Sequence, residues 1–265
     1  MPNIVITNDD GVQAPGIQAL AEALDEFGSV FVVAPDRNWS AAGHPKTLHK
    51  PLRVQQVTWL DGRKALACSG APSDCVALAL LGLISGPIDL VVSGVNSNYN
   101  LATDVFYSGT VAGAMEACIS DIPAIAFSMG PAHDSPVPED KALTHAGFVA
   151  ADIVRNVFAH GMPPHVMLNV NIPWASAERF RGIEVTRLGQ RIYRDALVKA
   201  DDPWGRPYYW IGGELPIGVP DDGTDIGAVE NGIVSVTPLG VDLTRHDFRA
   251  EMAGWSFAKE ASVAG

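Results

Sequence analysis

Short apolar runs without polar alternation are the feature that most constrains how this chain folds. Residues 4–6 are Ile-Val-Ile, and residues 89–93 are Asp-Leu-Val-Val-Ser. A strand with one face in water alternates polar and apolar side chains, whereas the strands of a parallel sheet are covered on both faces and stay apolar throughout. The runs therefore predict a largely parallel sheet with helices on both sides.

Helical patterns separate these runs along the first two thirds of the chain. The expected strands are residues 3–7, 29–34, 88–93, 124–128 and 165–172, and the expected helices are residues 15–27, 72–84, 110–120 and 141–159. Strands that alternate with helices of this length form βαβ units. The sequence thus predicts an α/β fold whose central layer is a doubly wound, largely parallel sheet.

The amino-acid composition changes after residue 173, and this change predicts a second part of the chain. Gly, Pro and aromatic residues accompany short strand-like pieces there, at residues 182–188, 208–212 and 232–237. We expect residues 1–173 to form the α/β core. Residues 174–265 are expected to form a β-rich C-terminal extension, with hairpins that reach a partner subunit.

The charge and the apolar content argue against two classes of partner. A formal net charge of -12 disfavours the attraction to phosphate backbones on which nucleic-acid binding depends. The longest apolar stretch, residues 75–84, is far shorter than the ~20 residues that span a bilayer, and the N-terminus carries no secretory signal. We therefore expect a cytoplasmic protein with reduced cysteines that binds neither nucleic acid nor membrane.

Two adjacent carboxylates, Asp9 and Asp10, follow the first apolar run. Ligands of doubly wound sheets bind beyond the carboxyl ends of the strands, and Ser40 and Asn96 follow two other predicted strands. Neighbouring carboxylates raise each other's pKa unless a cation neutralises them. Carboxylate, hydroxyl and amide oxygens suit Mg²⁺ or Mn²⁺, with Ca²⁺ as a further candidate. The alternative for Asp-Asp-Gly is a tight turn or a helix N-cap.

Small residues at the start of a later helix indicate a phosphate site. Free backbone N–H groups at a helix N-terminus bind phosphate; Ser108 and Thr110 add hydroxyl donors, and Gly109 permits close approach. The simpler interpretation is that Ser108 is an N-cap residue. His44 lies in a basic loop, residues 37–53, which either contacts an anionic substrate or is solvated.

Hydrolysis of a phosphate monoester is the chemistry that suits a metal ion beside a helix N-terminus. The ion polarises a phosphoryl oxygen and helps to generate hydroxide, so that metal-bound water attacks phosphorus. The G-x-S-x-G, Walker and G-x-G-x-x-G motifs are absent. Two alternatives stay open. In the first, Asp9 is the nucleophile of a phosphoaspartyl-type phosphatase, although such enzymes need a D-x-D motif. In the second, the chain is a non-enzymatic, Mg²⁺-binding, receiver-like signalling module.

A series of motifs runs in order along nearly the whole chain. They are T-N-D-D-G at 7–11, A-P-G at 14–16, V-A-P-D-R-N at 33–38, S-A-A-G-H at 40–44, G-A-P-S-D-C at 70–75, V-S-G-V-N at 92–96, Y-S-G-T-V-A at 107–112, N-V-N-I-P at 169–173, T-D at 224–225 and S-V-T-P-L at 235–239. Together they resemble the SurE family, the survival-protein 5'-nucleotidases.

The resemblance implies a Rossmann-like core and a divalent-metal-dependent phosphomonoesterase that hydrolyses nucleoside 5'-monophosphates to nucleoside and phosphate. Activity on 3'-monophosphates and an exopolyphosphatase side activity stay open, as does base preference. The extension is expected to exchange elements within a homodimer or homotetramer.

The same resemblance assigns roles to individual residues. The ligands of one metal ion per subunit fall on Asp9, Asp10, Ser40 and Asn96. Catalytic positions fall on Asn8, Asp9 and Ser108. Substrate-binding positions fall on Asn8, Asn96, Ser108, Gly109 and Thr110, to which the basic loop adds His44.

The loop after Asn96 departs from the family pattern. The usual form is N-x-G-x-N-x-G, whereas residues 96–102 are N-S-N-Y-N-L-A, which puts Asn98 and Ala102 at the glycine positions. We expect an altered loop conformation or base preference, with metal binding retained because Asn96 is present.

Overall fold

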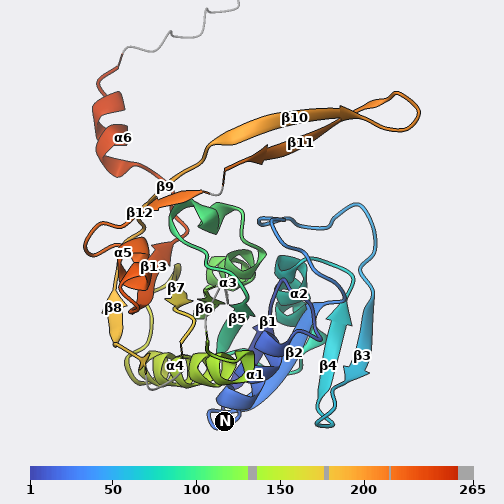
Figure 1. Cartoon of the computed structure of the whole chain (residues 1–265). Helices are drawn as coiled ribbons and strands as arrows, with labels where there is room; N and C mark the ends of the chain where they lie inside the picture. Colours follow the sequence, from blue (N-terminus) through green and yellow to red (C-terminus); the bar gives the residue numbers. More distant parts are fainter. Residues whose placement is uncertain (131–135, 176–178, 215, 256–265) are drawn as a thin grey trace, which may run out of the picture.

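A computed structural model describes residues 1–130, 136–175, 179–214 and 216–255 (Figure 1). Its strands are β1 (Asn3–Thr7), β2 (Ser29–Pro35), β3 (Val54–Thr58), β4 (Lys64–Cys68), β5 (Leu90–Asn96), β6 (Ala124–Met129), β7 (Val166–Ile172), β8 (Ile183–Val185), β9 (Gln190–Ile192), β10 (Asp195–Asp201), β11 (Pro207–Gly213), β12 (Ile217–Val219) and β13 (Val234–Gly240). Its α-helices are α1 (Pro15–Leu24), α2 (Pro72–Leu78), α3 (Gly109–Ile119), α4 (Glu139–His160), α5 (Asp225–Glu230) and α6 (His246–Met252). A π-helical turn, η1 (Ala79–Leu83), and a 3₁₀ helix, η2 (Ala102–Phe106), complete the described elements.

Nine strands form the central sheet in the order β3-β4-β2-β1-β5-β6-β7-β13-β8. Neighbouring strands run parallel except at two places, β3 beside β4 and β13 beside β7. The predicted α/β fold with a largely parallel sheet is confirmed. The strand order also reverses direction on either side of β1, which is the arrangement that leaves a ligand crevice beyond the carboxyl ends of the strands.

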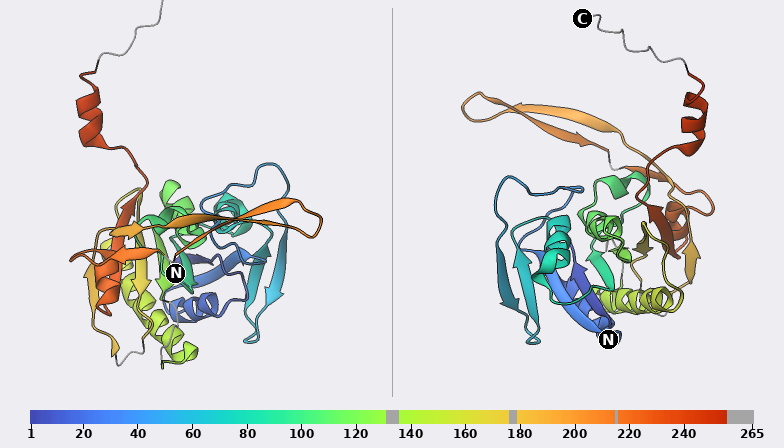
Figure 2. Two further views of the ribbon diagram at one scale, coloured as in Figure 1. Left: turned by 45° about the horizontal axis from the view of Figure 1, so that its top comes forward. Right: turned by 180° about the vertical axis from the view of Figure 1, so that it is seen from behind.

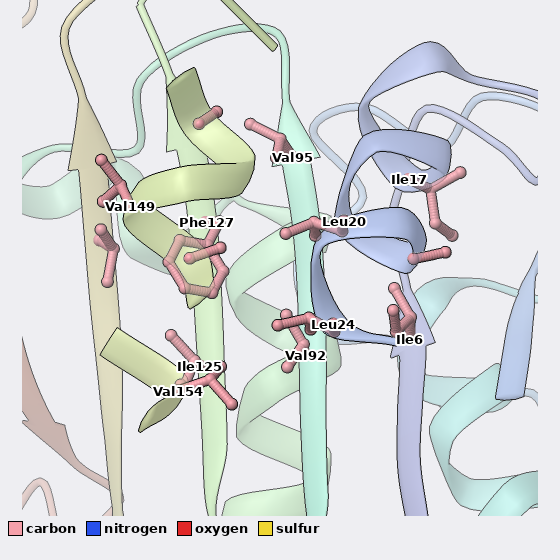
Figure 3. Close-up of a cluster of buried hydrophobic side chains, with 14 of the residues drawn as sticks. Ile6, Ile17, Leu20, Leu24, Val92, Val95, Ile125, Phe127, Val149 and Val154 are labelled. Atoms are coloured by element: carbon pink, nitrogen blue, oxygen red, sulfur yellow. The ribbon is translucent and has the colours of Figure 1, made fainter. Parts of the chain in front are cut away.

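Helices cover both faces of the sheet, as the apolar strands require. Successive side chains of a strand point to opposite faces. Ile4 and Ile6 of β1 accordingly pack with α1 and α4, whereas Val5 packs with residues of α2 and α3. Figure 3 shows the first of these layers, in which Leu20 and Leu24 of α1 lie against the sheet beside Phe127 of β6.

The predicted elements differ from the observed ones mainly at their ends. Helix α1 stops at Leu24 and not at Phe27, and the helix from Pro72 passes into the π-helical turn η1. Strand β5 continues through Asn96, so this residue ends the strand and does not follow it. The sequence patterns predict neither β3 nor β4; β3 gives little signal because it is a polar, largely exposed edge strand with the sequence V-Q-Q-V-T.

The chain after residue 173 contains strands that return to the central sheet and strands that leave it. β8 and β13 extend the sheet beyond β7, whereas β10 and β11 form a separate antiparallel hairpin that projects over the rest of the molecule (Figures 1 and 2). Helix α6 stands away from the core in the same views. The division at residue 173 stays a prediction.

Within the described ranges, no helix combines the length and apolar character needed to cross a membrane. The three cysteines, Cys68, Cys75 and Cys118, are buried and free, as the sequence predicts.

Candidate active site

The turn that follows β1 is shaped by Asn8. Its side-chain Nδ2 donates to the carbonyl of Gly11 (3.0 Å), and its Oδ1 accepts from the Gly11 backbone N–H (3.1 Å). Gly11 has a φ of 106°, a conformation that side chains strongly disfavour. This closed turn holds Asp9 and Asp10 at the rim of the sheet. Asp-Asp-Gly can therefore form a tight turn and still present its aspartates as ligands.

Asp9 lies against the start of α3. It is 3% exposed, and its Oδ1 accepts a hydrogen bond from the Thr110 hydroxyl (2.5 Å). A Cβ atom built on Gly109 would lie 2.8 Å from the Cβ of Asp9. The backbone groups of Gly109 and Thr110 also donate to the Asp9 carboxylate. The anion that the helix N-terminus contacts in this structure is therefore Asp9 itself.

Asp10 is joined to the basic loop through Asn38. The Asn38 Nδ2 donates to Asp10 Oδ1 (3.2 Å), while its Oδ1 accepts from the Ser40 backbone N–H (2.8 Å). The neighbouring Trp39 N–H donates to the carbonyl of Asp9 (2.8 Å). Two contacts thus fix the start of the loop on the aspartate turn and bring Ser40 to the same rim.

Asn96 is 9% exposed and ends the strand beside β1. Its Nδ2 donates to the carbonyl of Asn98 (2.7 Å), which leaves its Oδ1, the atom that binds cations, for other partners. The rest of this loop is held by Asn100, whose backbone N–H, carbonyl and side chain bond to Asn171, Asn169 and Ser128. Loop stabilisation therefore accounts for Asn100.

The two carboxylates have raised pKa values. Burial raises the pKa of Asp9, and the hydrogen bond from Thr110 opposes this effect. Burial, followed by the charge of Asp9, raises the pKa of Asp10. Among the described residues, no Lys, Arg or His side chain forms an ion pair with either one. This turn therefore brings together two carboxyl groups whose charged forms a bound cation would stabilise.

Ser108 is the N-cap of α3. Its Oγ accepts the backbone N–H of Val111 (3.0 Å), and the residue is 6% exposed. The N-cap interpretation of the sequence is correct in geometry. It does not remove a role in binding, because a hydroxyl that accepts one hydrogen bond keeps its O–H as a donor.

His44 lies against α3 and pairs with a buried carboxylate. Its Nε2 is 2.8 Å from Glu116 Oε2, and the Lys46 Nζ is 2.8 Å from the other oxygen. Glu116 is 7% exposed, and these partners, His44 first, lower its pKa. The contacts of His44 and Lys46 with Glu116 thus fasten the basic loop to the helix that carries Ser108 at its start.

Ala102 occupies a position that favours glycine. Its φ is 51°, in the left-handed region, and its backbone N–H donates to Asp225 Oδ2 (2.8 Å). Asn98 does not share this conformation, since its φ is not positive. The departure from the family pattern therefore strains the loop at Ala102 only.

The donor set fits a hard divalent cation. Two carboxylates, a hydroxyl residue and an amide oxygen are oxygen ligands, which Mg²⁺ and Mn²⁺ prefer over zinc. Within the described part of the chain, no group of three or more His, Cys, Asp and Glu residues is arranged so that it could hold a metal ion. A cation bound here would accordingly depend on Ser40, Asn96 and water as well as on Asp9 and Asp10.

The fold and this rim define an α/β protein in which oxygen atoms suited to a cation lie beside the N-terminus of helix α3. A sequence model of the family described as Survival protein SurE matches residues 4–195. The chain belongs to the SurE family.

Relatives match over nearly their whole length. A protein of Herpetosiphon aurantiacus described as 5'-nucleotidase SurE is 51% identical over 263 residues, which cover 97% of this chain and 100% of the relative. One of Chloroflexus aggregans with the same description is 48% identical over 254 residues, covering 96% and 99%. The crystal structure of the SurE protein from Aquifex aeolicus superposes with a TM-score of 0.78 at 41% identity, covering 95% of this chain and 98% of that one.

Sequence reasoning assigned no site role to Asn38 and did not foresee which group Thr110 contacts. Asn38 precedes Ser40 by two residues, and this spacing is the signal of an Asx turn. Nothing in the sequence reveals that the Thr110 hydroxyl binds Asp9, because the two lie 101 positions apart.

Proposed function

We propose that this protein is a divalent-metal-dependent phosphomonoesterase that hydrolyses nucleoside 5'-monophosphates to nucleoside and phosphate. The observation that carries the proposal is the contact of the buried Asp9 with Gly109 and Thr110, because it puts cation donors and an anion-binding helix end side by side. The two relatives described as 5'-nucleotidase SurE support the substrate class.

Asp9, Asp10, Ser40 and Asn96 are the residues that would hold one Mg²⁺ or Mn²⁺ ion. When bound, such an ion polarises a phosphoryl oxygen and lowers the pKa of water at the site. Asp9 has a second task, since its carboxylate fixes the start of α3 through Thr110.

The chain's own donors bind and orient the phosphoryl group. Ser108 keeps its O–H for a phosphoryl oxygen because its Oγ lone pair, not its proton, caps the helix. Asn8 uses one of its two amide N–H groups on Gly11 and keeps the other. The N-terminus of α3 adds the positive end of the helix dipole, while its first amides already donate to Asp9. His44 supports binding by holding the Ser40 loop on α3 through Glu116.

Phosphate release is the assay that tests this function. AMP and GMP are incubated with the purified chain and Mn²⁺ or Mg²⁺, and with a chelator as the metal-free reference. Asp9→Asn is expected to lower turnover by more than ~100-fold, the scale of a single electrostatic element of an active site. Asp152→Asn, on the exposed surface of α4, is the matched control and should keep full activity. Undiminished turnover in Asp9→Asn would remove the proposed role of Asp9.

The same preparation separates the open alternatives. Activity on 3'-AMP and on polyphosphate defines the selectivity. A ³²P-labelled protein trapped by acid quench during turnover would indicate a phosphoaspartyl intermediate instead of direct attack by water. Labelling by acetyl phosphate without hydrolysis of any ester would favour the receiver-like module.

We also infer that the hairpin β10–β11 pairs with a second copy of the chain in a homodimer or homotetramer. Its side chains are exposed in the single chain, with Ile211 87%, Leu197 72% and Trp210 65% exposed. Exposed apolar surface of this extent marks an interaction site. Sedimentation velocity is expected to show an oligomer, and Ile211→Glu a smaller species.

A further inference from the structure

The C-terminal part of the chain contacts the 3₁₀ helix η2 through Asp104. The Asp104 carboxylate binds the guanidinium of Arg191, in β9, and the hydroxyl of Tyr193. The Asp104 and Arg191 side chains are only 18% and 23% exposed. The hydroxyl of Thr103, beside Asp104, donates to Tyr193 as well (3.3 Å). In Figure 1, β9 lies next to the green segment that precedes α3.

A second contact holds the first residue of η2. Asp225, at the start of α5, is fully buried. Its Oδ2 accepts the backbone N–H of Ala102 (2.8 Å), and its Oδ1 accepts the backbone N–H of Gly189 (2.8 Å). One carboxylate therefore joins the first residue of η2 to the segment that leads into β9. We name these two contacts, Asp104 with Arg191 and Tyr193 and Asp225 with Ala102 and Gly189, the η2 clamp.

The clamped helix in turn fixes the start of α3. The carbonyl of Asp104 accepts the backbone N–H of Tyr107 (2.9 Å) and that of Ser108 (3.1 Å). The carbonyl of Tyr107 accepts the backbone N–H of Gly43 (3.0 Å), three residues after Ser40. The position of η2 thus sets the position of the Ser108 hydroxyl and of the loop that carries Ser40.

We propose that Asp104, Arg191 and Asp225 are positioning residues, and that docking of the C-terminal segment through the η2 clamp places Ser108 for reaction. This inference rests on the proposed function of the α3 start. Neither carboxylate touches the rim itself, and each acts through backbone hydrogen bonds. Since β9 leads directly into the hairpin β10–β11, the clamp makes the geometry of the site depend on the part of the chain that carries this exposed hairpin.

Arg191→Gln in the full chain is the variant that tests the clamp. A misplacement of about 1 Å far from the chemistry costs up to ~100-fold in rate, so we expect kcat/KM for AMP to fall by about ten- to a hundredfold. Hydrogen exchange of residues 104–111 should become faster, with exchange in α4 unchanged. Arg191→Lys keeps the charge and should recover part of the loss. Tyr193→Phe removes one hydroxyl and should produce a smaller loss in the same direction.

Arg194→Gln is the matched control, since Arg194 follows closely in the chain but forms an exposed pair with Glu214. It should leave both measurements at the wild-type level. Wild-type kcat/KM and wild-type exchange at residues 104–111 in Arg191→Gln would overturn the clamp. Faster exchange everywhere, with unchanged kcat/KM per folded molecule, would show a purely structural role and would overturn it too. A wild-type chain that hydrolyses no phosphoester would refute the proposed function, while local exchange at residues 104–111 would still report on the clamp.

Discussion

Gly109→Ala is the substitution for which the structure gives the most direct expectation. An alanine Cβ at this position would lie 2.8 Å from the Cβ and 3.0 Å from Oδ2 of Asp9. Both separations are shorter than the 3.5–4.0 Å at which carbon atoms make favourable contact, so the Asp9 side chain or the start of α3 has to move by roughly 1 Å. The backbone φ at Gly109 is not in the left-handed region, so the added methyl group acts through this contact and not through backbone strain.

The expected effect is large on activity and small on stability. A displacement of that size in a group that positions the reacting atoms costs about a hundredfold in kcat/KM, which corresponds to about 2.7 kcal/mol. In a helix interior alanine is favoured over glycine by about 1 kcal/mol, and at the first position of α3 a smaller part of this gain offsets the steric cost. The free energy of unfolding should therefore change much less than the activation free energy.

Steady-state hydrolysis of AMP and thermal unfolding of the same sample measure the two quantities. Gly240→Ala is the control, because its Cβ would meet nothing closer than 3.9 Å, at the carbonyl of His165. It should leave kcat/KM unchanged. A Gly109→Ala variant that folds and keeps the wild-type kcat/KM would refute the argument that close contact of Asp9 with the helix start is required.

Three further perturbations have defined outcomes. Ala102→Gly should raise the free energy of unfolding by about 1 kcal/mol and Tm by about 2–4 °C, since it relieves a left-handed residue; an unchanged Tm would contradict this. The raised pKa of Asp10 means that its charge destabilises the metal-free fold once the pH rises through that pKa. Asp10→Asn should thus raise the metal-free Tm at neutral pH and abolish stabilisation by Mn²⁺, and a retained Mn²⁺ effect would exclude Asp10 as a ligand. His44, then Lys46, lowers the pKa of Glu116 below its ordinary value of 4.5, so the pairing stabilises the fold above that value and is lost as the pH falls through the lowered pKa. Denaturant titrations between pH 3 and 6 should show that the cost of Glu116→Gln shrinks with acid, and a pH-independent cost would refute it.

The sheet could be predicted because the apolar composition of its strands indicates that they are buried on both faces. Apolar runs such as residues 4–6 and 89–93 require cover on both faces, and the helices found between the strands provide it. Strand β3 was missed because it lies at the edge of the sheet, where polar side chains face water. Among the described strands, β9 and β12 pair only with each other, and local sequence carries little signal for such a pairing.

The candidate site could be predicted in outline for a similar reason. The carboxyl ends of parallel strands meet at one rim, so the sequence predicts that Asp9 and Asn96 lie close together. The partners that fix them were not foreseen. The bond of Asp9 to Thr110 and that of Asp104 to Arg191 join residues 101 and 87 positions apart, and such contacts depend on tertiary packing rather than on any local pattern.

Anomalous diffraction from a crystal grown with Mn²⁺ tests the central claim of this account most directly. The account predicts one strong peak per chain within coordination distance of the Asp9 and Asp10 carboxylates, with the Ser40 hydroxyl and the Asn96 Oδ1 turned toward it, and no such peak in Asp9→Asn. A wild-type crystal that is grown with Mn²⁺ and shows no peak beside these two carboxylates would contradict it.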